Sequence, residues 1–124
     1  MVVGALTLEL HLPGCRSLKD KRALLRPLLE AARQRHGVSA AEVGLQDEHQ
    51  RARLGFALVS GDGGQARRLL QRLERDLVER GPLRVVSRHL ALWRPLDEGS
   101  GGAIDEGPYA GDWSSWAREE GEST

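Results

Sequence analysis

Asparagine is absent from this chain of 124 residues, cysteine occurs once, and aromatic residues make up only 4% of it. A single cysteine excludes an intramolecular disulfide and a cysteine-based zinc site, which fits a reducing cytoplasm. No apolar run approaches the roughly 20 residues of a membrane-spanning helix. The first residues also lack the basic segment of a secretion signal. We therefore expect a cytoplasmic protein with no membrane segment, no cofactor and no bound metal.

Neither sign of charge is in excess, because 18 basic and 18 acidic side chains balance over the whole chain. The two signs of charge are, however, unevenly distributed along the chain. Residues 1–96 carry 17 basic and 10 acidic side chains, a net +7, whereas residues 97–124 carry one basic and eight acidic, a net −7. The second segment is rich in Gly and Ser and has no hydrophobic period, so it cannot bury enough apolar area to offset its ordering entropy. We predict a domain over 1–96 and an acidic, largely disordered tail over 97–124 that competes with anionic partners of the domain.

Hydrophobic periodicity predicts six elements of secondary structure. Alternation with a period of two predicts strands over Val2–Leu12, Val38–Asp47, Ala52–Ser60 and Leu83–Trp93. A period near 3.6 predicts two helices, from Ser17 to about His36 and from about Gly64 to Arg80. This order and right-handed crossovers predict an α+β fold, a ferredoxin-like βαββαβ sandwich with a four-stranded, mostly antiparallel sheet and two helices on one face. We expect the first and third strands at the centre of the sheet and its other face open to solvent or to a partner.

The string Ser17-Leu18-Lys19-Asp20-Lys21-Arg22 begins the first predicted helix. It places three cations in the first turn, where the helix dipole favours anions and each cation costs roughly a few tenths of a kcal/mol. A bound phosphate relieves this cost, so the string indicates an anion-binding site. In the alternative interpretation, the stem of Lys21 covers apolar surface and the other charges are solvated.

Helical spacing extends these cations into a stripe, because residues three, four and seven apart lie on one side of an α-helix. The predicted nucleic-acid-binding residues are Arg16, Lys19, Lys21, Arg22, Arg26 and Arg33. Cations gathered on one face are the electrostatic footprint of a protein that binds a phosphate backbone. The second helix carries a weaker stripe of Arg68, Arg72 and Arg75, for which an ordinary solvated face is the favoured interpretation.

Two other modes of action lack the residues that they require. RNA-recognition motifs stack bases on aromatic residues of the central strands. The open face of the first strand offers Ala5, Thr7, Glu9 and His11 instead, and Phe56 is the only aromatic residue of the third strand. Acyl-phosphate hydrolysis on this fold uses a water-orienting asparagine, which is absent. Cys15 lies near Arg16 and a helix start, where a thiolate is favoured, but no base or orienting group accompanies it. We predict no enzymatic activity.

Several strings carry a resemblance to a known family. Ser17–Arg22 is close to SLKEKR, and Val38–Val43 matches a V-S-x-x-E stretch. Further matches in the central hairpin are Gln46-Asp47, Gln50-Arg51-Ala52, Leu54-Gly55-Phe56-Ala57 and Val59-Ser60. In these strings residues 1–96 resemble the YlxP-like family of small bacterial proteins, also called domain of unknown function 503. The resemblance implies a ferredoxin-like fold with no established activity. Family genes often lie near those for translation initiation factor two and ribosome-binding factor A, which implies a role near ribosomes or RNA.

The resemblance also indicates where a partner contact is expected. The family usually has Trp at position 49 and an aromatic residue at position 36, and this chain has His at both. A contact through His49, Gln50 and Arg51 is then altered or pH-dependent. We predict a non-catalytic binding module whose partner is RNA or the ribosome. The alternative is a homodimeric protein-interaction or small-molecule-sensing module that associates through the open sheet face, where small and apolar residues suit an interface.

Overall fold

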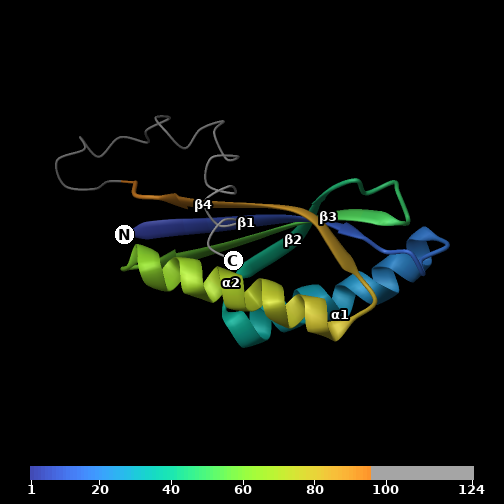
Figure 1. Ribbon diagram of the computed structural model, residues 1–124, viewed down its shortest axis with the longest axis horizontal. Coiled ribbons are helices and arrows are strands. Elements are labelled where there is room, and N and C mark those ends of the chain that lie inside the picture. Colours follow the sequence, from blue (N-terminus) through green and yellow to red (C-terminus); the bar gives the residue numbers. More distant parts are fainter. Residues whose placement is uncertain (96–124) are drawn as a thin grey trace.

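The computed structural model describes residues 1–95 and contains the six predicted elements in the predicted order (Figure 1). The strands are β1 (Val2–His11), β2 (Ser39–Gly44), β3 (Arg51–Ser60) and β4 (Arg84–Trp93). The helices are α1 (Leu18–His36) and α2 (Gly63–Arg80). The acidic tail predicted over 97–124 lies outside the described residues. Within the described part, neither helix is both long enough and apolar enough to cross a membrane.

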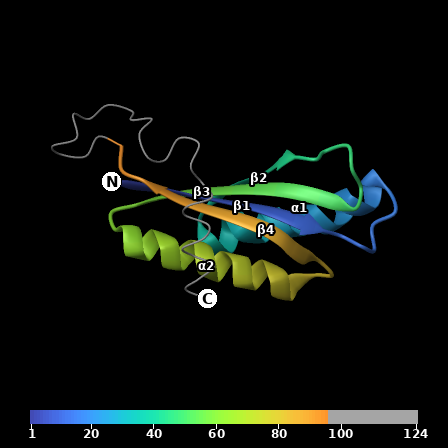
Figure 2. The ribbon, with the colours of Figure 1, turned by 45° about the horizontal axis from the view of Figure 1, so that its top comes forward.

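The sheet has the strand order β2-β3-β1-β4, and every neighbouring pair is antiparallel. The first and third strands are therefore central, as predicted. Both helices lie on one face of the sheet, and the other face is left uncovered by helices (Figure 2). This arrangement confirms the ferredoxin-like α+β fold.

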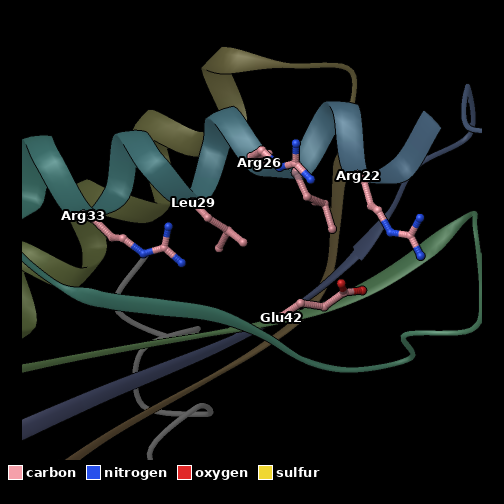
Figure 3. Close-up of a pocket in the computed structure, with 6 residues that line it drawn as sticks. Arg22, Arg26, Leu29, Arg33 and Glu42 are labelled. Atoms are coloured by element: carbon pink, nitrogen blue, oxygen red, sulfur yellow. The ribbon is translucent and has the colours of Figure 1, made fainter. Parts of the chain in front are cut away.

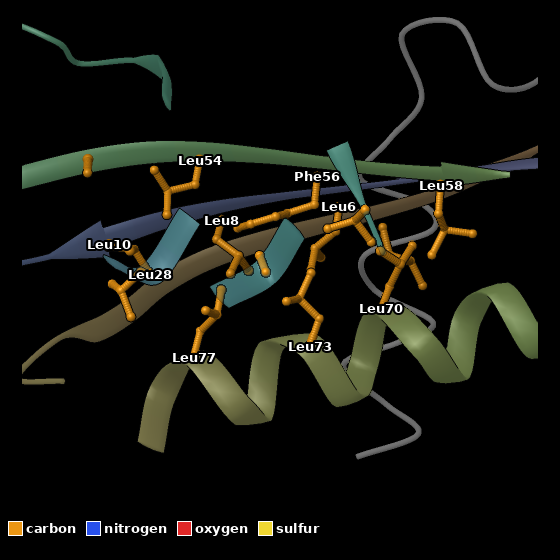
Figure 4. Close-up of a cluster of buried hydrophobic side chains, with 14 of the residues drawn as sticks. Leu6, Leu8, Leu10, Leu28, Leu54, Phe56, Leu58, Leu70, Leu73 and Leu77 are labelled. Carbon is orange, nitrogen blue, oxygen red and sulfur yellow. The ribbon is translucent and has the colours of Figure 1, made fainter. Parts of the chain in front are cut away.

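The core lies between the sheet and the two helices (Figure 4). Even-numbered side chains of β1, such as Leu6 and Leu8, are buried and pack in one cluster with Leu70 and Leu73 of α2. Burying each such leucine stabilises the fold by about 1.5–3 kcal/mol. Phe56 also points into this core, so it does not offer a ring to a base on the open face.

Both ends of α1 are set by the residues that the sequence indicated. The Ser17 hydroxyl accepts a hydrogen bond from the Asp20 amide at 3.0 Å. The Asp20 carboxylate in turn accepts from the Arg16 amide at 3.0 Å. At the other end Gly37 has a left-handed φ of 64°, and its amide bonds to the carbonyl of Arg33 at 3.2 Å. Only glycine adopts this conformation without strain. These caps fix the length of α1 and thereby the position of its cations.

The second strand is shorter than its alternating pattern predicts, because it ends at Gly44 rather than at Asp47. The next residue, Leu45, has a φ of 57°, in the left-handed region that turns the chain out of the sheet. Such a conformation costs about 1 kcal/mol in a residue with a side chain. A hydrogen bond from Lys21 to the Leu45 carbonyl stabilises this conformation. Because this contact comes from a residue far away in the chain, the alternating pattern of the strand cannot predict it.

Candidate nucleic-acid interface

Lys21, one of the predicted phosphate-binding residues, lies in the interior, since its side chain is only 2% exposed. Its ammonium group donates to the carbonyls of Leu45 at 2.9 Å and Arg51 at 3.2 Å, and it pairs with Glu42 at 2.8 Å. Two hydrogen bonds and one ion pair therefore compensate the burial of this ammonium group. The structure therefore corrects the inclusion of Lys21 among the phosphate-binding candidates: it is a structural cation that ties α1 to both ends of the β2–β3 turn.

Most residues of the string Ser17–Arg22 have structural roles in the fold. Ser17 and Asp20 cap the helix, and Lys21 anchors it to the turn. Of the cations in the string, Lys19 and Arg22 remain exposed, and neither forms a hydrogen bond or ion pair with the described residues. A candidate interface must therefore rest on these two residues and on the cations further along α1.

A groove of about 260 Å³ lies between α1 and the edge strand β2 (Figure 3). The residues that line it are Arg22, Leu25, Arg26, Leu29, Arg33 and Glu42. Figure 3 shows Leu29 between Arg26 and Arg33 on the side of α1 that faces β2. The three arginines span about 16 Å along the helix, given its rise of about 1.5 Å per residue. We call this site the α1–β2 groove.

The three arginines of the α1–β2 groove differ in their contacts. Arg22 and Arg26 are exposed, and neither has an ion pair or hydrogen bond within the described part of the chain. Arg33 donates through Nη2 to the carbonyl of Ala40 at 2.8 Å and through Nη1 to Glu30 at 3.3 Å. Arg33 therefore joins α1 to β2 and keeps further guanidinium donors beside the two free cations.

The other predicted contact residues do not line the groove. Arg16 is exposed in the segment before α1. His49 and Gln50 are exposed in the β2–β3 turn. The Arg51 guanidinium group binds Glu9 at 2.6 Å, on the open face of the sheet. Residues 49–51, at the end of the turn and the start of β3, therefore do not line the groove with the arginines of α1.

One half of the open sheet face is polar. A hollow of about 280 Å³ lies there, lined by Thr7, Glu9, Arg53, Ser87 and His89. Hydrogen bonds from Arg51, and then from Arg53 at 3.1 Å, hold the pKa of the Glu9 carboxyl below its usual value. The sequence pattern placed Glu9 on this face but not beside these arginines, because their proximity depends on the register of β1 against β3.

The other half of the open face is apolar and carries small side chains. A shallow hollow of about 320 Å³ is lined by residues of β1, β2 and β3, among them Ala5, Ala41, Val43, Gly55 and Ala57. A Cβ atom on Gly55 would lie 3.0 Å from Cγ1 of Val43, so the glycine lets this valine lie flat on the sheet. Val43 is 54% exposed and Val59 68% exposed. This surface is the one that the predicted homodimer requires.

His36 belongs to the packing between the helices. Its Nε2 atom lies 2.9 Å from the carboxylate of Asp76 on α2, and its side chain is nearly buried. This hydrogen bond, with a second one from Arg80 at 3.1 Å, lowers the pKa of Asp76. Position 36 in this chain therefore links α1 to α2 and offers little surface to a partner.

Cys15 is buried, and its surroundings differ from those predicted. Burial raises the pKa of the thiol, and the nearby Asp20 carboxylate raises it further, with Lys21 opposing them. The expectation of a stabilised thiolate was therefore wrong, because burial outweighs the neighbouring cation. Among residues 1–95, no group of three His, Cys, Asp or Glu side chains is placed to hold a metal ion.

These features define a ferredoxin-like α+β domain with a basic groove between its first helix and an edge strand. Residues 3–90 match the family described as "Protein of unknown function (DUF503)", and the chain belongs to this family. The chain is 36% identical over 72 residues to "Uncharacterized protein YlxP" of Bacillus subtilis (strain 168), which covers 58% of this chain and 78% of that protein. The family indicated by the sequence strings is thereby confirmed, and neither description assigns an activity or a partner.

Proposed function

We propose that this protein is a non-catalytic module that binds RNA, free or within the ribosome, through the α1–β2 groove. The observation that carries the proposal is the pair of exposed guanidinium groups, Arg22 and Arg26, which have no anionic partner within the described residues. Arg33 holds a third guanidinium group beside them. A planar guanidinium group binds phosphate through two parallel N–H donors, so a row of arginines suits an RNA backbone.

The apolar part of the groove favours single-stranded RNA. Leu29 lies between Arg26 and Arg33, is only partly buried, and provides apolar surface for an unpaired base. Bases of a duplex are stacked and paired, whereas those of a single strand can turn out of the stack toward a protein. Arg16 and Lys19 extend the path of positive charge beyond the amino-terminal end of the groove.

Steep dependence on salt is the expected signature of this binding. If Arg16, Lys19, Arg22, Arg26 and Arg33 each neutralise one phosphate, the log–log slope for single-stranded RNA is about −3.5. Raising the salt concentration from about 50 mM to about 500 mM then lowers the affinity roughly 3,000-fold. Fluorescence anisotropy of the full chain with a labelled RNA of about 12 nucleotides measures the slope. An oligonucleotide of the same sequence with an uncharged backbone is the control. Binding that is no tighter at the lower salt concentration contradicts the proposal.

The open sheet face favours a second function, self-association of two copies of the chain. Val43 and Val59 are exposed on its apolar half, and the alanines and Gly55 beside them leave a flat surface. Two sheets pack face to face at about 10 Å when the side chains between them are small and apolar. A homodimer would bury this surface and still leave the α1–β2 groove accessible.

Sedimentation velocity of the full chain tests the dimer. We expect a dimer of the wild-type protein and a monomer of the Val59→Lys variant, because a buried lysine without a partner opposes the interface. Val78→Lys is the matched control, since Val78 is an exposed valine on α2, at 43% exposure. A wild-type chain that stays monomeric at about 100 μM contradicts this second function.

A further inference from the structure

We propose that Glu42 selects the base that enters the α1–β2 groove and favours cytosine over uracil. This inference rests on the RNA binding proposed above and assigns a specificity-determining residue to the same site. Glu42 is the single acidic residue among those that line the groove. A carboxylate repels a phosphate, so Glu42 does not bind the backbone; besides pairing with Lys21, it can act only on the base.

The carboxylate of Glu42 is anchored on one side and free on the other. Its Oε2 atom pairs with the ammonium group of Lys21 at 2.8 Å. Neither carboxylate oxygen forms a hydrogen bond within residues 1–95; Oε2 is buried, and 22% of the side chain is exposed. Figure 3 shows the carboxylate pointing from β2 toward α1. Lys21 thus holds the group in place while Oε1 remains available to a ligand in the groove.

A carboxylate oxygen accepts hydrogen bonds and donates none, which decides the base that it favours. Cytosine carries the amino donor N4–H₂ at the position where uracil carries the carbonyl acceptor O4. A cytosine beside Glu42 gains a hydrogen bond, whereas a uracil in the same place sets two acceptors against each other. Arg22 and Arg26 would hold the flanking phosphates, and Leu29 would contact the ring.

The contacts of β2 argue against an added peptide strand at this edge. The carbonyl of Ala40 accepts from Arg33 at 2.8 Å, and that of Glu42 accepts from the Gln46 side chain at 3.4 Å. Residues two apart in a strand direct their carbonyls to the same side. Carbonyls that a peptide strand would need are therefore already occupied, and the groove presents side chains to a ligand.

Oligocytidylate and oligouridylate of about 12 nucleotides are the probes, because the two bases have rings of the same size. Each is titrated with the full chain at pH 7.5 and low salt and followed by anisotropy. A hydrogen bond to a charged group corresponds to roughly tenfold tighter binding of the cytosine oligomer. In the Glu42→Gln variant the amide oxygen takes the place of Oε2 beside Lys21, while the NH₂ group replaces Oε1 in the groove. We expect the preference for cytosine to be lost or reversed.

Glu30→Gln is the matched control, because Glu30 is an exposed carboxylate on α1 that pairs with Arg33 outside the lining of the groove. It removes the same charge, so both oligomers bind more tightly and the preference for cytosine persists. Equal binding of the two oligomers to the wild-type chain, with a steep salt slope, overturns the role of Glu42 and leaves RNA binding intact. A preference that persists in Glu42→Gln also overturns it. Failure of the wild-type chain to bind either oligomer overturns both proposals. This outcome is measured on the wild-type chain alone, so it does not depend on whether a variant folds.

Discussion

Replacing Lys21 by methionine is expected to lower the free energy of unfolding by about 3 kcal/mol, because a buried ion pair then loses one partner. The Lys21 side chain is 2% exposed, and its ammonium group pairs with Glu42 and donates hydrogen bonds to the carbonyls of Leu45 and Arg51. Methionine fills a similar volume but donates no hydrogen bond and carries no charge, so two carbonyls lose their hydrogen bond and Glu42 loses its ion pair. Urea denaturation of the full chain, followed by circular dichroism, measures the difference.

Lys19→Met is the control for this measurement. Lys19 is exposed two residues earlier on the same helix and forms no hydrogen bond or ion pair with the described residues. Its replacement should change the free energy of unfolding by less than about 0.5 kcal/mol. If Lys21→Met is as stable as Lys19→Met, the network around Lys21 contributes no net stability, and its assignment as a structural cation is wrong.

Replacing the three arginines of the α1–β2 groove by glutamine is expected to weaken RNA binding roughly 100-fold at about 50 mM salt. The log–log slope against salt should fall in magnitude by about 2, because three phosphate contacts of a single strand are lost. The variant is Arg22→Gln, Arg26→Gln and Arg33→Gln, measured by anisotropy with the same labelled RNA. Glutamine keeps a polar, hydrogen-bonding side chain, so the change reports chiefly the loss of charge.

A matched triple variant on α2 distinguishes the contribution of the groove arginines to RNA affinity from that of the net charge of the domain. Arg68, Arg72 and Arg75 are exposed on α2 and do not line the groove. Replacing them by glutamine removes the same three charges and should leave the affinity within a few-fold of the wild type. Equal losses in the two triple variants would show that affinity follows net charge alone, which contradicts a binding site in the groove.

Arg33 also forms a structural hydrogen bond, so the triple variant needs a control in which this bond is kept. Loss of its hydrogen bond to the Ala40 carbonyl should cost about 1 kcal/mol of stability. A double variant of Arg22 and Arg26 leaves this contact in place. In this double variant the log–log slope of RNA affinity against salt should fall in magnitude by about 1.4, and the free energy of unfolding should equal that of the wild type.

The elements of the fold follow from local patterns in the chain. Alternating apolar residues predicted β1 and β3, and the residues Ser17 and Gly37 predicted the ends of α1. Each of these features depends on interactions within a few residues, such as the bond from the Asp20 amide to Ser17. Helical spacing likewise placed the arginines of α1 on one side of the helix, because their relative angles depend on helix geometry alone.

The groove itself and its acidic residue could not be predicted in this way. The α1–β2 groove exists only because β2 lies at the edge of the sheet beside α1, and Glu42 enters it from that strand. No periodic pattern in the sequence distinguishes Glu42 from an ordinary exposed acid. The position of the helix against the sheet brings it opposite the arginines.

Local patterns in the chain were enough to predict the order of elements, the caps of α1, the family and the concentration of positive charge in residues 1–96. Tertiary structure alone decided which cations are free to bind. Lys21 and Arg22 are neighbours in the chain, yet one is buried and the other exposed. The acceptors of Lys21 at Leu45 and Arg51 lie 24 and 30 residues away, and only packing of the β2–β3 turn against α1 brings them within hydrogen-bond distance.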